Sequence, residues 1–151
     1  MKLGSDPLSQ LFPQPLVLDT NIVLDLFVFN DEAARPLMQG LEQRSLHWLA
    51  TLAMRGELAR VLGYPQIVPR LAFYGLQAAG VLAAFDCYAR VVAAPVKAPV
   101  TCSDADDQKF IDLAVAHQCP LLSKDRAVLS MTKRLAALRV TASAVFPAVT
   151  T

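Results

Sequence analysis

Four acidic residues lie at positions from which they could meet in one cleft. Asp19 and Asp125 each follow a short apolar run, whereas Glu57 and Asp107 belong to segments with helical spacing. Two carboxylates about 4 Å apart repel each other by about 4 kcal/mol at an effective dielectric constant of about 20, so a cluster of them requires a cation. Oxygen-only ligands favour Mg²⁺ or Mn²⁺, and such ions activate water for hydrolysis of a phosphodiester, most naturally in nucleic acid.

Most of these acids also have a simpler structural interpretation, which stays open at this point. An acid directly after a strand can cap the helix that follows, and this applies to Asp19 and to Asp125. Asp104, Asp106 and Asp107 come together at the start of a predicted helix. There each acid can complement the helix dipole, which is worth about 0.3–1 kcal/mol, and we expect at least one or two of the three to do only that.

Glu57 is harder to explain by structure alone. It shares a helical face with Ala53, Met54 and Val61, and a carboxylate on a buried face requires a partner. The structural alternative is a surface pair with Arg60, three residues on, worth about 0.3–0.5 kcal/mol. That pair would leave the apolar neighbours unexplained.

The apolar pattern predicts the elements that must position these acids. Strands and helices alternate, which indicates βαβ units, a parallel sheet and helices on both faces. In such a fold ligands bind beyond the carboxyl ends of the strands, where Asp19 and Asp125 are expected. The predicted strands cover residues 16–18, 46–50, 90–93 and 121–122. Helical spacing covers residues 20–27, 32–44 with a break near Pro36, 51–62, a long stripe over 67–85, 104–116 and 127–138.

Length and composition restrict the class of protein. The chain has 151 residues, 54% of them hydrophobic, and a formal charge of +1. This length and composition predict one globular domain. We expect the domain over 15–146, after a disordered lead-in over 1–14 and before a tail over 147–151. Charged residues interrupt every long apolar stretch, so no membrane span is expected. The histidines number two, and Cys87, Cys102 and Cys119 are far apart, so we expect neither a zinc site nor a disulfide framework but a reducing cytoplasm.

Four motifs together resemble the PIN domain family: residues 17–21, 51–62, 104–110 and 122–125. More narrowly, they are similar to the PIN subfamily of toxins in bacterial toxin–antitoxin pairs. The resemblance covers residues 16–140. It implies a three-layer α/β/α sandwich around a mostly parallel sheet of four to five strands, and a Mg²⁺- or Mn²⁺-dependent endoribonuclease. It also implies a homodimer and a cognate antitoxin that blocks the acidic cleft.

The resemblance also implies roles for individual residues. Phe110 and Ala114 match the apolar positions of the third motif, which favours Asp107 over its acidic neighbours as the motif's acid. The resemblance assigns the metal and the catalysis to Asp19, Glu57, Asp107 and Asp125, and auxiliary roles to Asn21, Asp104 and Ser123. Three positions depart from the subfamily: Gln108 and Ala127 stand where acids are common, and Lys124 where a small residue is common.

Three alternatives compete with the ribonuclease hypothesis. A phosphotransferase of haloacid dehalogenase type needs a second acid two residues after the nucleophile, where Asn21 stands, and an amide cannot act as that acid. A receiver domain needs an acidic pair near the first strand, but the next acid after Asp19 is Asp25. A non-catalytic binding module would use the fold and its apolar surface for a partner, without needing all four acids.

Contacts with RNA must come from local cations, because the net charge is close to zero. Five basic residues flank the proposed acids and are candidates for phosphate contacts, although each is equally well a solvated surface charge. They are Arg55, Arg60, Lys109, Lys124 and Arg126.

Overall fold

A computed structural model describes residues 13–146 of the chain. Five strands form one sheet in the order β3-β2-β1-β4-β5, and every neighbouring pair is parallel. The strands are β1 (Gln14–Leu18), β2 (Leu46–Ala50), β3 (Ala89–Val91), β4 (Leu121–Leu122) and β5 (Ala142–Ser143). The expected lead-in overlaps the described residues only at positions 13 and 14, and the expected tail lies outside them.

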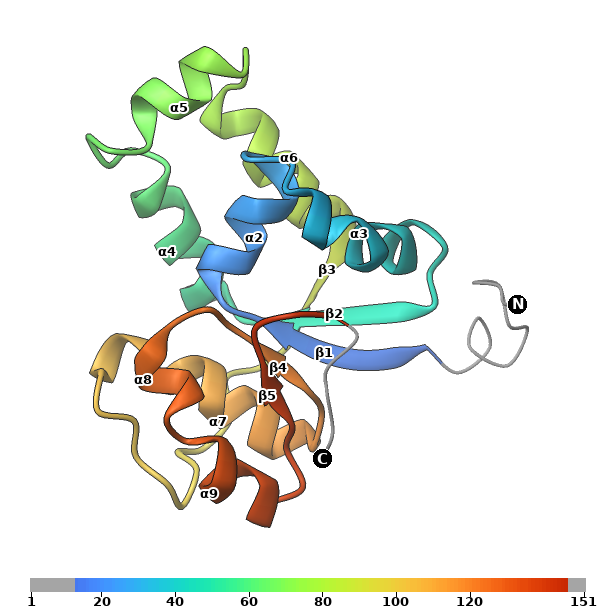
Figure 1. Ribbon diagram of the computed structural model, residues 1–151, viewed down its shortest axis with the longest axis vertical. Coiled ribbons are helices and arrows are strands. Elements are labelled where there is room, and N and C mark those ends of the chain that lie inside the picture. Colours follow the sequence, from blue (N-terminus) through green and yellow to red (C-terminus); the bar gives the residue numbers. More distant parts are fainter. Residues whose placement is uncertain (1–12, 147–151) are drawn as a thin grey trace.

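Helices cover both faces of this sheet, so the fold is the predicted three-layer α/β/α sandwich (Figure 1). One layer contains α2 (Thr20–Phe27), α3 (Arg35–Glu42), α4 (Leu52–Val61), α5 (Val68–Phe73) and α6 (Ala78–Tyr88). The other contains α7 (Gln108–His117), α8 (Arg126–Leu129) and α9 (Thr132–Ala137). Two short 3₁₀ helices, η1 (Glu32–Ala34) and η2 (Ala105–Asp107), precede α3 and α7.

The two layers explain why the central strands are continuous apolar runs. Strands of a parallel sheet are buried on both faces, so they do not alternate between apolar and polar residues. Val17 of β1 and Leu121 of β4 are fully buried; α7 packs on β1, and its residues Phe110 and Leu113 are also fully buried. The start of α7 is therefore held firmly against the sheet.

Several predicted helices have different bounds in the structure. The apolar stripe over 67–85 divides into α5 and α6 at Gly75, whose φ of 68° favours glycine. Tyr74 on that stripe is exposed, so the stripe does not form core along its whole length. The helix expected over 127–138 is likewise two short helices, α8 and α9, and the one expected over 104–116 begins as the 3₁₀ turn η2.

No residue range was predicted for β5, because Ala142 and Ser143 do not form an apolar run like Leu121–Leu122 of β4. Among the described residues, no helix is long and apolar enough to cross a lipid bilayer.

Candidate active site

The acids at the ends of β1 and β4 lie together because these two strands are adjacent and parallel. Val17 pairs with Leu121 and Leu18 with Leu122, so the residues that follow both strands reach the same edge of the sheet. The backbone amide of Asp19 donates to the carbonyl oxygen of Leu122 at 2.9 Å, which holds this residue beside the end of β4. The third acid, Asp107, approaches the same edge from the start of α7.

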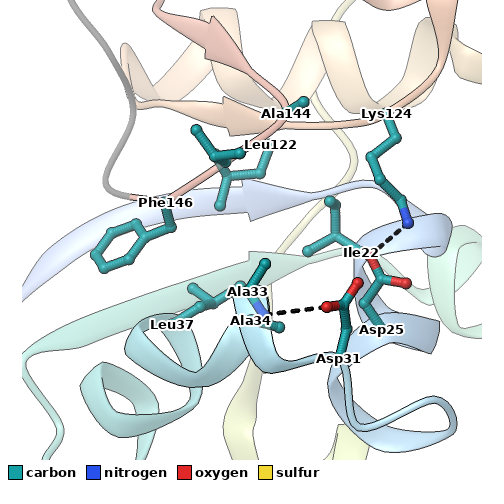
Figure 2. Close-up of a pocket in the computed structure, with 11 residues that line it drawn as sticks. Ile22, Asp25, Asp31, Ala33, Ala34, Leu37, Leu122, Lys124, Ala144 and Phe146 are labelled. Carbon is teal, nitrogen blue, oxygen red and sulfur yellow. Dashed lines mark hydrogen bonds and ion pairs between the residues drawn. The ribbon is translucent and has the colours of Figure 1, made fainter.

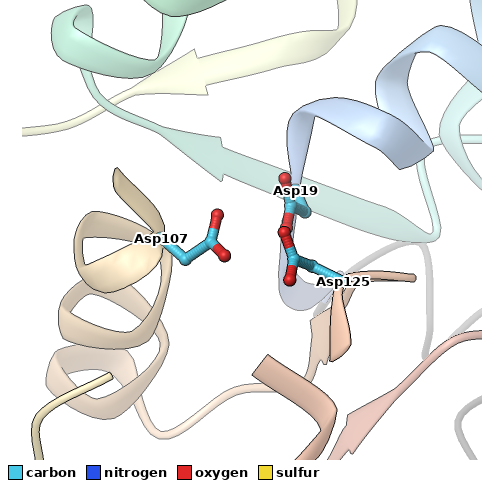
Figure 3. A group of neighbouring side chains, drawn as sticks. All are labelled: Asp19, Asp107 and Asp125. Carbon is cyan, nitrogen blue, oxygen red and sulfur yellow. The ribbon is translucent and has the colours of Figure 1, made fainter. Parts of the chain in front are cut away.

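Three aspartates form a cluster at this edge, as Figure 3 shows. Asp19, Asp107 and Asp125 each offer one carboxylate oxygen, and these oxygens all lie within 4.8 Å of one another. Asp19 is 4% exposed and Asp107 is 7% exposed, while Asp125 is half-buried. These three side chains could hold a hard divalent cation, because all the donor atoms are carboxylate oxygens.

Helix capping explains some of the acids and not others. The side chain of Asp125 accepts from the backbone amide of Ala127 at 2.9 Å, and that of Asp104 accepts from the amide of Asp106 at 3.0 Å. Asp19 and Asp107 also stand at helix N-caps, but the side chain of neither makes a capping hydrogen bond. Capping therefore leaves two buried carboxylates unexplained.

Ser123 joins two of the three aspartates. Its hydroxyl donates to Oδ2 of Asp19 at 2.6 Å and accepts from the backbone amide of Asp125 at 3.0 Å. The Oδ1 atom of Asn21 accepts from the backbone amide of Lys124 at 3.1 Å. Both side chains therefore fix the loop after β4 against the loop after β1, which positions Asp19 relative to Asp125.

Replacement of Ser123 by Ala should lower Mn²⁺ affinity about 10- to 100-fold, which is the usual cost of losing a group that orients a metal ligand. The hydrogen bond to Asp19 is the physical reason. Mn²⁺ titration monitored by calorimetry measures the change. Ser130→Ala is the matched control, because the Ser130 hydroxyl is exposed and donates only to the carbonyl of Ala127. Equal Mn²⁺ affinity in the two variants would contradict the positioning role.

The cluster holds more negative charge than its surroundings compensate. Burial raises the pKa of Asp107 to about 8, together with a hydrogen bond to Asp125 and repulsion from Asp19, Asp125 and Asp104. Burial also raises the pKa of Asp19, although the hydrogen bond from Ser123 opposes this effect. The Oδ2 atom of Asp107 is buried and has no hydrogen-bond partner among the described residues. A cation bound by the three aspartates would satisfy both the charge and this oxygen.

The raised pKa of Asp107 predicts how the stability of the metal-free chain depends on pH. In the unfolded chain this carboxyl loses its proton near the ordinary aspartate pKa of 3.8, whereas the folded chain keeps it until about pH 8. The contribution of Asp107 to the stability of the folded chain is therefore fully present below pH 4. It falls as the pH rises and is lost once the pH has passed about 8.

Asp107→Asn removes this dependence, and it should stabilise the metal-free chain at neutral pH by about 1–3 kcal/mol. Urea unfolding in EDTA at several pH values measures the free energy. Stability of the wild-type chain that rises steadily from pH 4 to pH 8 would contradict the prediction.

Glu57 lies beside the cluster, but its oxygens are engaged elsewhere. Thr20 donates its hydroxyl to Oε2 of Glu57, and the ammonium group of Lys109 pairs with Oε1. The expected alternative partner, Arg60, makes no ion pair with Glu57, so that interpretation is wrong. The real partners lie on α2 and α7, far from Glu57 in sequence.

The candidate phosphate contacts fall into two groups. Three of the cations form ion pairs: Lys109 with Glu57, Arg55 with Asp86, and Lys124 with Asp25 at 2.6 Å (Figure 2). Arg60 and Arg126 are exposed and form no ion pair within residues 13–146. The pairing of Asp25 with Lys124 was not expected; the sequence signal for Asp25 is an acid inside the apolar helical segment over 20–27.

Gln108, which stands where the subfamily commonly has an acid, has a structural role here. Its Oε1 accepts from the backbone amide of Cys102 at 2.6 Å, and its Nε2 donates to Oδ1 of Asp112 at 2.7 Å. The same amide nitrogen donates to the carbonyl of Val100 at 3.0 Å. Gln108 thus ties the loop before η2 to α7, immediately next to Asp107.

Comparison with known families gives a match to the PIN domain over residues 15–127. A search among curated proteins gives no match. The matched range contains the three aspartates, Glu57 and four of the five strands. It covers well over half of the sequence, and the chain therefore belongs to the PIN domain family.

Proposed function

We propose that the chain is a metal-dependent endoribonuclease that hydrolyses phosphodiester bonds of RNA. PIN domains have a nuclease fold, and this chain has a cluster of acidic residues in that fold. The observation that carries the proposal has two parts. Three aspartates converge, and the buried Oδ2 of one of them, Asp107, has no hydrogen-bond partner in residues 13–146.

The residues fit Mg²⁺ or Mn²⁺. The cluster offers carboxylate oxygens alone, and neither histidine nor cysteine belongs to it. Asp19, Asp107 and Asp125 would hold the ion, which when bound supplies activation of the attacking water and neutralisation of charge on the phosphodiester. Loss of the proton from Asp107 is required for it to act as a ligand.

Glu57 has a separate role in this proposal. Because Thr20 and Lys109 hold its two oxygens in place, Glu57 is suited to orient the attacking water rather than to complete the ligand set. Ser123 and Asn21 position the ligands, and Asp104 adds negative charge near Asp107.

Lys109, Lys124 and Arg126 are proposed contacts for RNA phosphates. Replacing Lys124 and Arg126 by Gln should therefore flatten the salt dependence of RNA binding.

The biological role we propose is that of a toxin in a toxin–antitoxin pair, acting in the cytoplasm as a homodimer that a cognate antitoxin blocks. The support is the combination of a PIN domain with a cluster of three aspartates. Induced expression should arrest growth of a bacterial host, and expression of Asp19→Asn should not. Undisturbed growth with the wild-type chain would contradict the toxin role.

The experiment that tests the proposed activity compares two labelled single strands of the same sequence, one RNA and one DNA, in the presence of Mn²⁺. We expect internal cleavage of the RNA. Products that arise only from the ends of the strand, or cleavage of the DNA alone, would contradict an endoribonuclease.

A further inference from the structure

A groove of about 320 Å³ opens beside the aspartate cluster, between α4 and the start of α7. Asp107 belongs both to the cluster and to the lining of this groove, so a molecule in the groove lies next to the proposed metal ligands. Val61 is the one aliphatic residue in the lining. The lining consists of Glu57, Arg60, Val61, Tyr64, Asp106, Asp107 and Lys109.

Two cations line the groove in different states. Lys109 is held in place, because its ammonium group contacts Glu57 and the backbone carbonyl of Asp106. Arg60 is exposed and belongs to none of the ion pairs of residues 13–146. Its Nη1 lies 3.6 Å from the position that a Cβ at Gly56 would occupy, so the guanidinium group lies along α4 beside Gly56. An unpaired guanidinium group in a groove is suited to bind a phosphate.

Tyr64 supplies an aromatic surface at the same place. Its side chain is 42% exposed, and its ring takes part in no aromatic pair among the described residues. The backbone around it is fixed, since its amide donates to Val61 and its carbonyl accepts from Ile67 and Val68. An accessible ring on a hydrogen-bonded backbone, beside cations, is suited to stacking of a nucleic-acid base.

We infer that this groove binds one nucleotide of single-stranded RNA next to the phosphate that is cleaved, with its base on Tyr64 and its phosphate on Arg60. The inference rests on the proposed function and adds two residues of the groove, Tyr64 and Arg60, that would hold the substrate. A base inside a duplex is already stacked on its neighbours, so its face is not free for Tyr64. The groove therefore discriminates against double-stranded RNA.

The test measures affinity without cleavage. A short fluorescent RNA lacking self-complementarity is titrated with the full chain in EDTA, and fluorescence anisotropy reports binding. Tyr64→Leu should weaken binding about 5- to 100-fold, the range expected for one stacked base, whereas Tyr64→Phe keeps the ring and the affinity. Tyr74→Leu is the matched control, because Tyr74 is 41% exposed and lies outside the groove.

A second variant tests the phosphate contact. Arg60→Gln should reduce the slope of log affinity against log salt by about 1, as expected for one lost phosphate contact. Arg134→Gln is the control, because Arg134 is an exposed arginine on α9, outside the groove. Thermal melts of each variant show whether it is folded as the wild type is.

Different results overturn different proposals. Equal affinity of Tyr64→Leu and wild type, equal binding of single-stranded and duplex RNA, or no RNA binding by the wild type overturns the inference about the groove. RNA binding that depends on Tyr64 but is never followed by cleavage in Mn²⁺ supports the groove and contradicts the ribonuclease. RNA cleavage by Tyr64→Leu with the KM of the wild type supports the ribonuclease and contradicts the inference about the groove.

Discussion

Asp19→Asn should lower Mn²⁺-dependent RNA cleavage by at least about 10²- to 10³-fold, the usual cost of removing one essential electrostatic group from an active site. Asn has nearly the same shape, but it carries no charge. Its amide has an NH₂ group in place of one carboxylate oxygen and a neutral carbonyl oxygen in place of the other. Asp19 is buried, its Oδ2 accepts from Ser123, and one of its oxygens lies within 4.8 Å of an oxygen of each of the other two aspartates. Initial rates with a fluorescent RNA measure the change.

Asp31→Asn is the matched control for this prediction. Asp31 is an exposed aspartate whose side chain caps η1 by accepting from the amide of Ala33 at 3.0 Å, and Asn caps helices equally well. The control should cleave RNA as the wild type does. If Asp19→Asn also retained the wild-type rate while remaining folded, the aspartate cluster would not be the active site.

Phe110→Ala should destabilise the chain by about 3–5 kcal/mol, the range for truncation of a fully buried aromatic residue. Phe110 is 0% exposed and lies three residues after Asp107, on the helix that packs against β1. The cavity would remove the contacts that hold the start of α7 on the sheet, so cleavage should also fall. Urea denaturation measures the free energy of unfolding.

Phe73→Ala provides the comparison, because Phe73 is 80% exposed on α5. Exposed truncations usually change stability by less than about 0.5 kcal/mol. A cost for Phe110→Ala no greater than that for Phe73→Ala would show that α7 is not anchored through this ring.

The sequence predicted the sheet and its parallel connections well, because the signals were local. The bounds of β2 and β4 match the expected strands, and α4 lies within the helical segment expected over 51–62, with Thr51 accepting from the amide of Met54 as its cap. The spacing that favoured Asp107 over Asp104 and Asp106 agrees with its position in the cluster, while its role as a ligand is still a prediction.

The parts that could not be predicted depend on contacts between distant segments. Lys109 and Thr20 reach Glu57 from two other helices, and no spacing within α4 indicates them. Breaks such as that at Gly75 interrupt a periodic apolar pattern without changing its period. Gly75 gave too weak a signal to divide the stripe into α5 and α6, because Gly80 in the same stripe lies inside α6.

The most direct test of the metal-dependent site is RNA cleavage by the EDTA-treated chain as Mn²⁺ is added back. We predict no cleavage in EDTA, recovery of internal cleavage by the wild type with increasing Mn²⁺, and no recovery by Asp107→Asn at the same concentrations. Cleavage that persists in EDTA, or that Asp107→Asn recovers as fully as the wild type, would contradict a metal site built on the three aspartates.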